Sequence, residues 1–168
     1  EYPDGSIYEG EFKSGQPSGS GSIVFPNGST YAGEWLNGNF EGKGLIITNG
    51  TSFEGDFKDG DPHGFGKMIS PDGYSYEGNW ENGQKEGLGK IVYTGGDVYE
   101  GHVKKGIRSG SGTLTLRNGI IIKGTWKDGN INGEGNIIEP DGDSYEGALI
   151  DGKRNGKGTT VSANGDSY

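Results

Sequence analysis

The 168-residue chain contains 37 glycines, 28% hydrophobic residues and a formal net charge of −9 at pH 7. Ordinary domains contain roughly 45–50% apolar residues and about 7% glycine, so this composition excludes a thick core between two layers. The acidic balance excludes nucleic acid as a partner, because nucleic-acid binding requires clustered Lys and Arg. The absence of cysteine excludes disulfides, thiolate zinc sites and a cysteine nucleophile. The 3 Trp, 9 Tyr and 6 Phe argue against disorder.

A repeat of 23 residues, with one copy of 22, runs through the whole chain. Within each copy, glycine recurs 3 residues before a large anchor residue and 2, 7, 11 and 13 residues after it. These positions hold 36 of the 37 glycines, and only Gly95 is out of register. A flexible linker would scatter its glycines, so the pattern indicates a repeat architecture. The anchors, taken as position 0, are Tyr8, Tyr31, Phe53, Tyr76, Tyr99, Ile122, Tyr145 and Tyr168.

The first element of each repeat is predicted to be a half-buried β-strand. In the first copy, Tyr8, Gly10 and Phe12 alternate with Glu9 and Glu11. Because successive side chains of a strand point to opposite faces, the rings share one face and the acids share the other. A large apolar residue recurs at position +4 and Glu recurs at position +1. The repeat therefore predicts an acidic stripe on the face away from the rings.

A turn at positions +6 and +7, such as Asn37-Gly38, leads into the second strand, for example at residues 42–48. An Asn-Gly or Asp-Gly pair ends most copies, and such pairs supply the positive φ angles of tight hairpin turns. Pro17 and Pro62 at position +9 predict a looser loop at the first turn, because proline lacks a donor for the sheet. Each repeat is therefore predicted to be a β-hairpin.

The turn also predicts which residues face one another across the hairpin. A two-residue turn would pair position 0 with +13 and +2 with +11, which places each ring opposite a glycine. The same register would pair Glu146 with Lys157, and Lys123 with Glu134, across their hairpins.

Consecutive hairpins predict an all-β fold, an elongated, twisted single-layer antiparallel sheet whose stability comes from contacts between neighbouring repeats. Residues 1–168 are expected to form a single array with repeats starting near residues 8, 31, 53, 76, 99, 122 and 145. We also expect the chain to be a piece of a longer protein, because it begins at Glu1 and carries no polar capping repeat.

The unit Tyr-x-Gly-x-Trp/Phe, followed by regularly spaced glycines, resembles the MORN (membrane occupation and recognition nexus) repeat. Its clearest copy is YEGNWENGQKEGLG at residues 76–89, whereas Val103, Ile122 and Leu149 depart from the aromatic pattern. The resemblance implies a hairpin array that serves as an accessory or scaffold module. In the family such arrays are linked to phospholipid contact, self-association and docking of partner segments. It also implies a cytoplasmic setting, at the cytoskeleton or the membrane periphery.

The aromatic face is the first candidate site. Most rings are expected to form the core, because the sheet has nothing else to bury. Ring edges that stay exposed over a glycine floor would form a groove for a helix or an extended peptide. The leading functional hypothesis is a non-catalytic protein-interaction scaffold that binds a partner segment in this groove. The predicted walls are Trp35, Phe57, Tyr76, Trp80, Tyr99 and Trp126.

Basic residues form a second candidate site. Lys104, Lys105 and Arg108 lie near one predicted turn, and a second basic group lies at residues 153–157. Phosphoinositide headgroups bind such patches, so the alternative function is a phospholipid-binding module that brings a larger enzyme or cytoskeletal protein to a membrane. Clusters of about 4–8 cations are the usual signal, so scattered solvated charge is the simpler interpretation.

No arrangement of residues predicts catalysis, a metal site or a cofactor. The two histidines, His63 and His102, have no matching partner pattern. No zinc-ligand spacing, P-loop or G-x-S-x-G motif occurs. The chain is therefore predicted not to be an enzyme. Exposed strands at the two ends of the array predict self-association through a terminal repeat.

Overall fold

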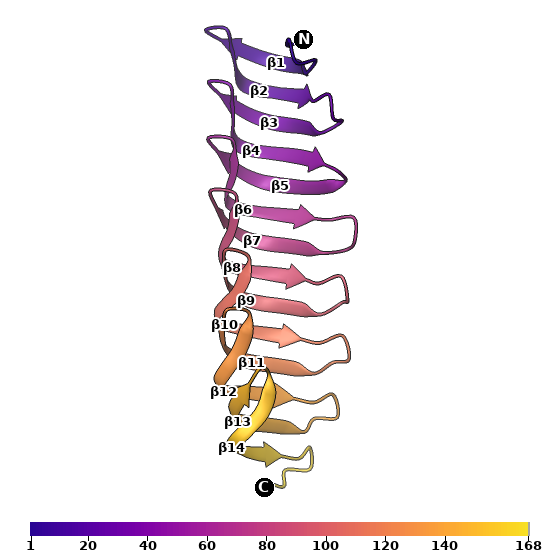
Figure 1. Cartoon of the computed structure of the whole chain (residues 1–168), viewed down its shortest axis with the longest axis vertical. Helices are drawn as coiled ribbons and strands as arrows, with labels where there is room; N and C mark the ends of the chain where they lie inside the picture. Colours follow the sequence, from indigo (N-terminus) through magenta and orange to yellow (C-terminus); the bar gives the residue numbers. More distant parts are fainter. Residues whose placement is uncertain (168) are drawn as a thin grey trace. The chain divides into compact units, whose positions relative to one another are not determined.

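The computed structural model describes residues 1–167, and every strand and turn in this range belongs to a β-hairpin array. Tyr168, the last anchor, lies outside the described residues. The chain divides into two compact units, Glu1–Lys85 (unit 1) and Glu86–Tyr168 (unit 2). The strands follow one another in one antiparallel sheet in the order of the sequence (Figure 1). This confirms the predicted all-β fold of tandem hairpins in a single layer.

The strands are short and similar in length in both units. Unit 1 contains β1 (Ile7–Lys13), β2 (Gln16–Val24), β3 (Thr30–Leu36), β4 (Asn39–Thr48), β5 (Thr51–Lys58), β6 (Asp61–Ile69) and β7 (Ser75–Glu81). The boundary between the units falls within β8 (Gln84–Val92). Unit 2 continues with β9 (Val98–Lys104), β10 (Ile107–Thr115), β11 (Ile121–Lys127), β12 (Asn130–Ile138), β13 (Ser144–Ile150) and β14 (Lys153–Val161).

The turn inside each repeat has two residues, as the predicted pairing across the hairpin assumed. In the first repeat it consists of Ser14 and Gly15, with φ angles of 51° and 80°. The looser loop predicted from proline is wrong, because Pro17 pairs directly with Phe12. Next to a two-residue turn, this pair is a non-hydrogen-bonded one, so the N–H that proline lacks would have pointed away from β1. Proline is therefore compatible with a tight turn at this position.

The predicted register is wrong by two residues. Tyr8 pairs with Ile23, and Gly10 pairs with Gly21, whereas a regular ladder would have placed Tyr8 opposite Gly21. The cause is a bulge between the Gly10 and Phe12 pairs, where the second strand has two more residues than the first. The bulge needs a residue with positive φ, and the glycine at position +11 supplies it, as in Gly19 with φ of 89°.

The same bulge separates the charged pairs that the sequence predicted. Glu146 lies opposite Thr159 and Lys123 lies opposite Asn136, so neither reaches its expected partner across the hairpin. Ion pairs form instead between neighbouring repeats, as between Lys90 and Glu100 at 2.8 Å.

The loops between repeats are longer than predicted. In the first, Gly28 N donates to Phe25 O at 2.9 Å, and Gly28, with φ of 81°, has positive φ while Asn27 does not. Such a three-residue loop combines a type I turn with a glycine bulge. The second repeat, one residue shorter, has the tight turn instead, with φ of 50° at Asn49 and 76° at Gly50. The missing loop residue explains the single spacing of 22 in the sequence.

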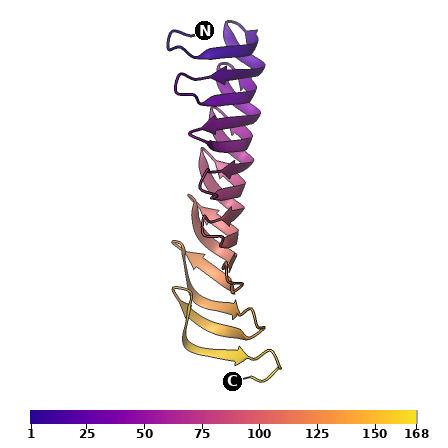
Figure 2. The same cartoon turned by 90° about the vertical axis from the view of Figure 1, so that its right-hand side faces the viewer.

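The bulge brings the glycines at +2 and +13 into an unbroken row across neighbouring strands. In unit 1 the row runs from Gly10 to Gly78, one glycine per strand. In unit 2 it runs from Gly89 to Gly158. The short turns lie along one edge of each unit and the longer loops along the other (Figures 1 and 2).

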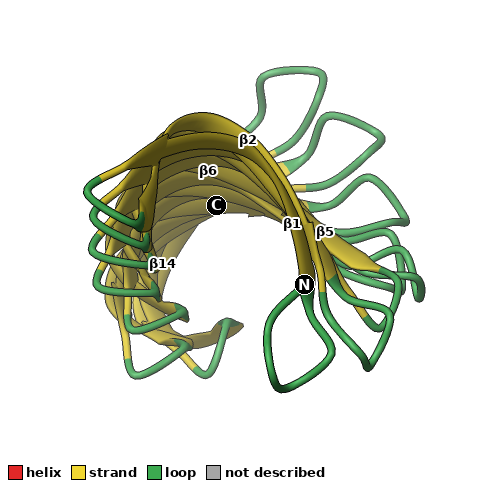
Figure 3. Cartoon of the chain, turned by 90° about the horizontal axis from the view of Figure 1, so that it is seen from above, coloured by secondary structure: helices red, strands yellow, loops and turns green. Residues whose placement is uncertain are grey.

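The anchor rings lie on one face of the sheet above this glycine row. Tyr31, Tyr76 and Tyr99 are 0% exposed although no second layer covers them. A flat single sheet would leave such rings in water, so the ring-bearing face must be the inner side of a curved sheet. Figure 3 shows this curvature in the strands of unit 1. We call the ring-bearing side the inner face and the opposite side the outer face.

Candidate functional site

Each anchor tyrosine closes the inner face over the glycine row. A Cβ atom added at Gly44 would lie 2.5 Å from Cε2 of Tyr31, so the ring occupies the space of the missing side chain. The Tyr31 hydroxyl donates to the carbonyl oxygen of Glu34 at 2.8 Å. Burial raises the pKa of Tyr31 to about 12, because the phenolate would lose its hydration. Rings and glycines therefore form one packed layer.

The tryptophans at position +4 join each repeat to the one before it. Nε1 of Trp35 donates to Gly21 O at 3.0 Å, and Trp80 makes the equivalent bond to Gly66 O at 3.1 Å. Trp35 also contacts the ring of Tyr31 edge to face, with centroids 5.2 Å apart. Edge-to-face pairs add about 0.5–1.5 kcal/mol beyond the burial of their area.

The six rings proposed as groove walls lie in this packed layer. Their exposed fractions range from 0% for Tyr76 and Tyr99 to 7% for Trp80. Unit 1 holds four of the six and unit 2 holds Tyr99 and Trp126, whose centroids are 5.5 Å apart. These rings therefore provide the floor of the inner face and offer little surface of their own. The six are Trp35, Phe57, Tyr76, Trp80, Tyr99 and Trp126.

Several side chains at position +9 lie beside the rings and remain partly accessible, and sequence reasoning missed their place on the inner face. In unit 1, Phe40 stacks on Tyr31 with ring centroids 3.7 Å apart, and it is half-buried. Lys85 is also half-buried, and its Nζ donates to the Tyr74 hydroxyl at 3.1 Å. Burial lowers the pKa of Lys85. The signal was present in the sequence, because a two-residue turn at positions +6 and +7 pairs position +9 with the large residue at position +4.

In unit 2, Arg108 occupies position +9 and lies over the ring of Trp126, 4.4 Å from its centroid. Its Nη2 donates to Gly129 O at 2.7 Å. Arg108 also lies 6.0 Å from the Tyr99 centroid. Burial raises the pKa of Tyr99 to about 12, and the positive charge of Arg108 opposes that rise. The guanidinium is thus fixed at the border between the inner face and the short turns.

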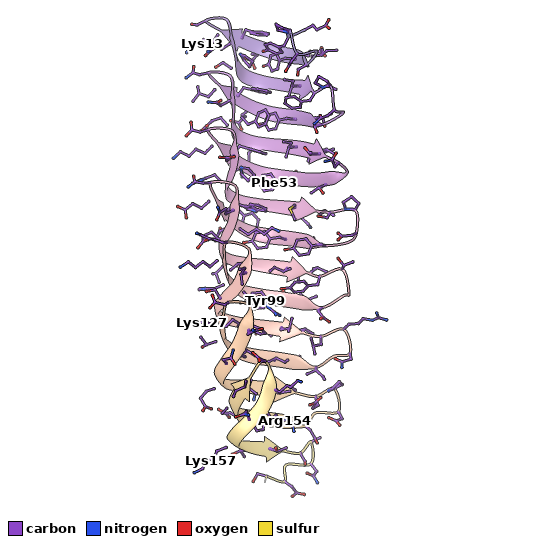
Figure 4. The ribbon with its side chains drawn as sticks, viewed as in Figure 1. Lys13, Phe53, Tyr99, Lys127, Arg154 and Lys157 are labelled. Carbon is purple, nitrogen blue, oxygen red and sulfur yellow. The ribbon has the colours of Figure 1, made fainter. Side chains whose placement is uncertain are left out.

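The three basic residues singled out in the sequence come together in the structure. Lys104, Lys105 and Arg108 line one pocket of about 410 Å³, and the structure adds Lys127 to them. Lys127 lies at the edge of the sheet with the short turns (Figure 4). Sequence reasoning missed Lys127 because it lies one repeat further along the chain, at the same position +5 as Lys104.

The second basic group does not form a comparable site. Arg154 forms a salt bridge with Glu139, with Nη2 and Oε1 3.0 Å apart. Lys153 and Lys157 are exposed on β14, and Figure 4 shows Lys157 at the edge of the sheet.

The outer face carries charges and exposed aliphatic side chains. Lys43 pairs with Asp56 at 2.6 Å beside an open depression above Gly44 and Gly55. Phe65 on β6 is 55% exposed on this face. The glycine row is therefore covered by rings on the inner face and open on the outer face.

Residues 1–167 contain no cluster of three or more His, Cys, Asp or Glu side chains that could hold a metal ion. His63 lies in β6 and His102 in β9, in different units. No helix long and apolar enough to cross a membrane occurs in the same range.

Comparison with known proteins supports the repeat assignment. The family model described as MORN repeat matches residues 8–30, 31–52, 53–73, 76–98, 99–121, 123–144 and 145–167. No curated protein matches the chain. The TCP domain of SAS-4 (dCPAP) from Drosophila melanogaster, solved in complex with a proline-rich motif of Ana2, is 16% identical with a TM-score of 0.58. The similarity covers 89% of this chain and 82% of that one, and it concerns the fold alone.

A second solved structure has a lower score. The TCP10 domain of Danio rerio CPAP, in complex with a peptide of Danio rerio STIL, is 17% identical with a TM-score of 0.30, over 96% of this chain and 86% of that one.

Proposed function

Since this chain belongs to the MORN repeat family, we propose that it is a non-catalytic protein-interaction module that binds a partner segment along its inner face. The proposed setting is the cytoplasm, at the cytoskeleton, which suits a chain without cysteine. The six predicted rings serve as the rigid floor of this site, and the half-buried residues at position +9 provide its accessible contacts.

One observation carries the proposal: the inner face is closed by apolar atoms, yet no second layer covers it in the described residues. Phe40, Pro62 and Lys85 of unit 1 are half-buried on this face rather than sealed. Aromatic-lined surfaces with a few polar groups are the usual docking sites for helices and proline-rich segments. A partner lying on this face would remove from water the apolar surface that the single layer leaves accessible.

The similar fold of the SAS-4 TCP domain supports the class of partner. That domain was solved with a proline-rich motif of Ana2 bound to it. Polyproline II segments pay little conformational entropy on binding and dock on aromatic surfaces. We therefore propose an extended peptide, with proline-rich sequences as the first class to test.

The experiment is a selection of random and proline-rich peptides displayed on phage against the whole chain. Affinities of the selected peptides would then be measured by fluorescence anisotropy. Replacing Phe40 with Ala is expected to weaken binding at least about fivefold, or ~1 kcal/mol. The matched control is Phe65→Ala, because Phe65 is a phenylalanine of the same unit on the outer face. Failure to select any peptide, or equal weakening by both variants, would overturn the proposal.

One observation supports the alternative function of phospholipid binding, namely the basic pocket of unit 2. Strong, salt-sensitive co-sedimentation with anionic vesicles, lost on replacing Lys104, Lys105 and Arg108 with Glu, would favour it. A net charge of −9 opposes general attraction to an anionic surface.

Self-association has a separate observation in its favour. In the described sheet, β1 has a neighbour on one side only, and Phe12 is 59% exposed, whereas the equivalent Phe57 is 3% exposed. We propose that a terminal strand pairs with a second copy. Light scattering before and after removal of residues 143–168 tests this, and an unchanged monomer in both would contradict it.

A further inference from the structure

The pocket in unit 2 lies between two consecutive short turns. The first turn, Lys105-Gly106, connects β9 to β10, and the second, Asp128-Gly129, connects β11 to β12. Four cationic side chains line it, from Lys104, Lys105, Arg108 and Lys127. Asp128 provides the one carboxylate of the lining, and Ile107 and Ser109 complete it. The lining thus carries an excess of positive charge in a chain whose net charge is −9.

The charges of this pocket are not compensated by ion pairs. In the described part of the chain, none of its four cationic side chains forms a salt bridge. Cations elsewhere in the chain do form salt bridges, as Lys67 does with Glu77 at 3.3 Å and Arg154 does with Glu139 at 3.0 Å. Glu86, next to the first turn, accepts a hydrogen bond from the backbone N–H of Lys105 at 2.9 Å. No carboxylate of the described residues therefore neutralises these four charges through an ion pair.

The pocket is held in shape by the backbone. Gly129 N donates to Arg108 O at 3.1 Å, and Arg108 Nη2 donates back to Gly129 O at 2.7 Å. The two turns are thus joined by reciprocal bonds around one arginine. The guanidinium also lies over Trp126, which limits its rotation. A pre-organised cation costs little entropy when it binds an anion.

We infer that this pocket binds a phosphate monoester carried by a serine or threonine of the partner peptide, an inference that rests on the proposed function. A phosphoserine carries about −1.5 to −2 charges and three strong acceptor oxygens at neutral pH. Four cations around one pocket, opposed by one carboxylate, match such a dianion better than the single charge of a glutamate. Both arginine and lysine bind phosphate groups, and Arg108 provides the guanidinium of this site beside three lysines.

The position of the pocket favours a peptide over a bilayer as the source of the phosphate. Arg108 belongs both to the pocket and to the inner face, so an extended segment on that face can reach the cations with one side chain. A membrane surface attracts proteins through several basic groups together, whereas the second basic group of unit 2 has its arginine paired with Glu139.

Two measurements on the whole chain test the inference. The first is an NMR titration with free O-phosphoserine, which requires no contact with the rest of the inner face. We expect shifts at the backbone amides of Lys105, Gly106 and Gly129. The second compares three degenerate peptide libraries that differ only in a fixed phosphoserine, serine or glutamate. Phosphoserine peptides are expected to bind at least about tenfold more tightly than either of the others.

A pair of double variants gives the test its specificity. Lys105→Ala with Lys127→Ala is expected to weaken phosphopeptide binding at least about tenfold. Lys153→Ala with Lys157→Ala removes the same charge from the same unit outside the pocket, and should change affinity less than about twofold. All four lysines are exposed, so both variants should fold, which circular dichroism would verify.

Several results would overturn the inference. Equal weakening by both double variants would show unspecific attraction, and equal binding of glutamate and phosphoserine peptides would show a site for carboxylates. Salt-sensitive binding to vesicles containing phosphatidylinositol bisphosphate, without phosphopeptide binding, would assign the pocket to lipid. If serine peptides bind the inner face while O-phosphoserine causes no shifts, the pocket is not a phosphate site and the proposed function stands. If O-phosphoserine causes shifts but no peptide is selected, the pocket binds phosphate and the proposed function fails, and with it the peptide as the source of the phosphate.

Discussion

Unit 1 and unit 2 have the same hairpins, bulges and glycine row, but they fill the inner face differently. In unit 1 rings touch rings, as Phe53 touches Trp80 with centroids 4.9 Å apart. In unit 2 aliphatic side chains take several ring positions, and Ile122 stands at an anchor. There the Cδ1 atom of Ile131, from position +9, occupies the space above Gly124, 2.5 Å from where a Cβ would lie. The glycine row needs apolar cover, but the cover can come from different repeat positions.

The two units also differ in charge. Residues 1–85 contain five Lys and Arg against thirteen Asp and Glu, for a net charge of −8. Residues 86–168 contain ten and eleven, for a net charge of −1. At position +9, unit 1 has three apolar residues and one cation, namely Pro17, Phe40, Pro62 and Lys85, and unit 2 has Arg108, Ile131 and Arg154. The difference in net charge therefore makes unit 2 better suited than unit 1 to an anionic group.

The largest effect is expected at a tryptophan of unit 1. Trp80→Ala should lower the free energy of unfolding by about 4 kcal/mol, because it removes a buried ring and its bond to Gly66. At the same repeat position unit 2 carries Val103 as well as Trp126, and Val103→Ala should cost only about 1.6 kcal/mol for two methyl groups. Urea unfolding checks both values, with the exposed Leu36→Ala as control. Equal costs at Trp80 and Val103 would contradict the contrast between aromatic and aliphatic side chains on the inner face.

The glycines at position +2, Gly33 in unit 1 and Gly124 in unit 2, differ in the space available for a Cβ atom. A Cβ at Gly33 would lie 2.5 Å from the backbone atoms of Gly44 and Lys43, which cannot move aside. At Gly124 the closest atom is the flexible Ile131 Cδ1, and the backbone is 3.1 Å away. We expect Gly33→Ala to cost about 3 kcal/mol and Gly124→Ala about 1 kcal/mol.

The control for these glycine variants is Gly95→Ala. No atom lies within 4 Å of a Cβ at Gly95, so the change should leave the urea midpoint almost unaltered. Because Gly→Ala lowers the entropy of the unfolded chain, a cost at Gly95 as large as at Gly33 would contradict the explanation of the glycines by close packing.

Alkaline pH gives a smaller difference between the units. Burial raises the pKa values of Tyr31 and Tyr99 to about 12, so the neutral phenols contribute stability that is complete below pH ~10, the ordinary tyrosine pKa. That stability should be lost as pH rises through 12. Replacing Arg108 with Met should raise the pKa of Tyr99 further and leave Tyr31 unchanged. Absorbance titration at the phenolate band, with Tyr→Phe variants for assignment, measures both.

Much of this architecture could be predicted from the sequence. Alternation in Tyr8–Phe12 assigns the faces, and the period assigns the hairpins, because both depend on local geometry. The register could not be derived from turn length alone, because the bulge adds residues without changing the turn. The recurring spacing of glycine at position +11 was the available signal for the bulge. A regular ladder needs no residue with positive φ at this position, whereas a bulge does. The loop length was signalled by the short second repeat around Asn49-Gly50.

The candidate sites were predicted less completely. The rings were expected to be mostly core, and their exposure of 0–7% shows that packing leaves little of them for a partner. The accessible residues at position +9 were missed because Pro17 and Pro62 led to the prediction of a loop at this position, whereas the structure pairs it with position +4. Three of the four cations in the pocket were singled out, but Lys127 becomes their neighbour only through the stacking of consecutive turns.

The cover over the glycine row can be tested most directly by a rescue experiment in unit 2. Ile131→Ala should uncover Gly124 and lower the free energy of unfolding by about 3 kcal/mol. Adding Ile122→Tyr restores the ring that other repeats carry, and should recover at least about 1 kcal/mol as a favourable coupling in a double-mutant cycle. A coupling of zero or of the opposite sign would contradict the claim that a glycine pair is stabilised by whichever side chain covers it.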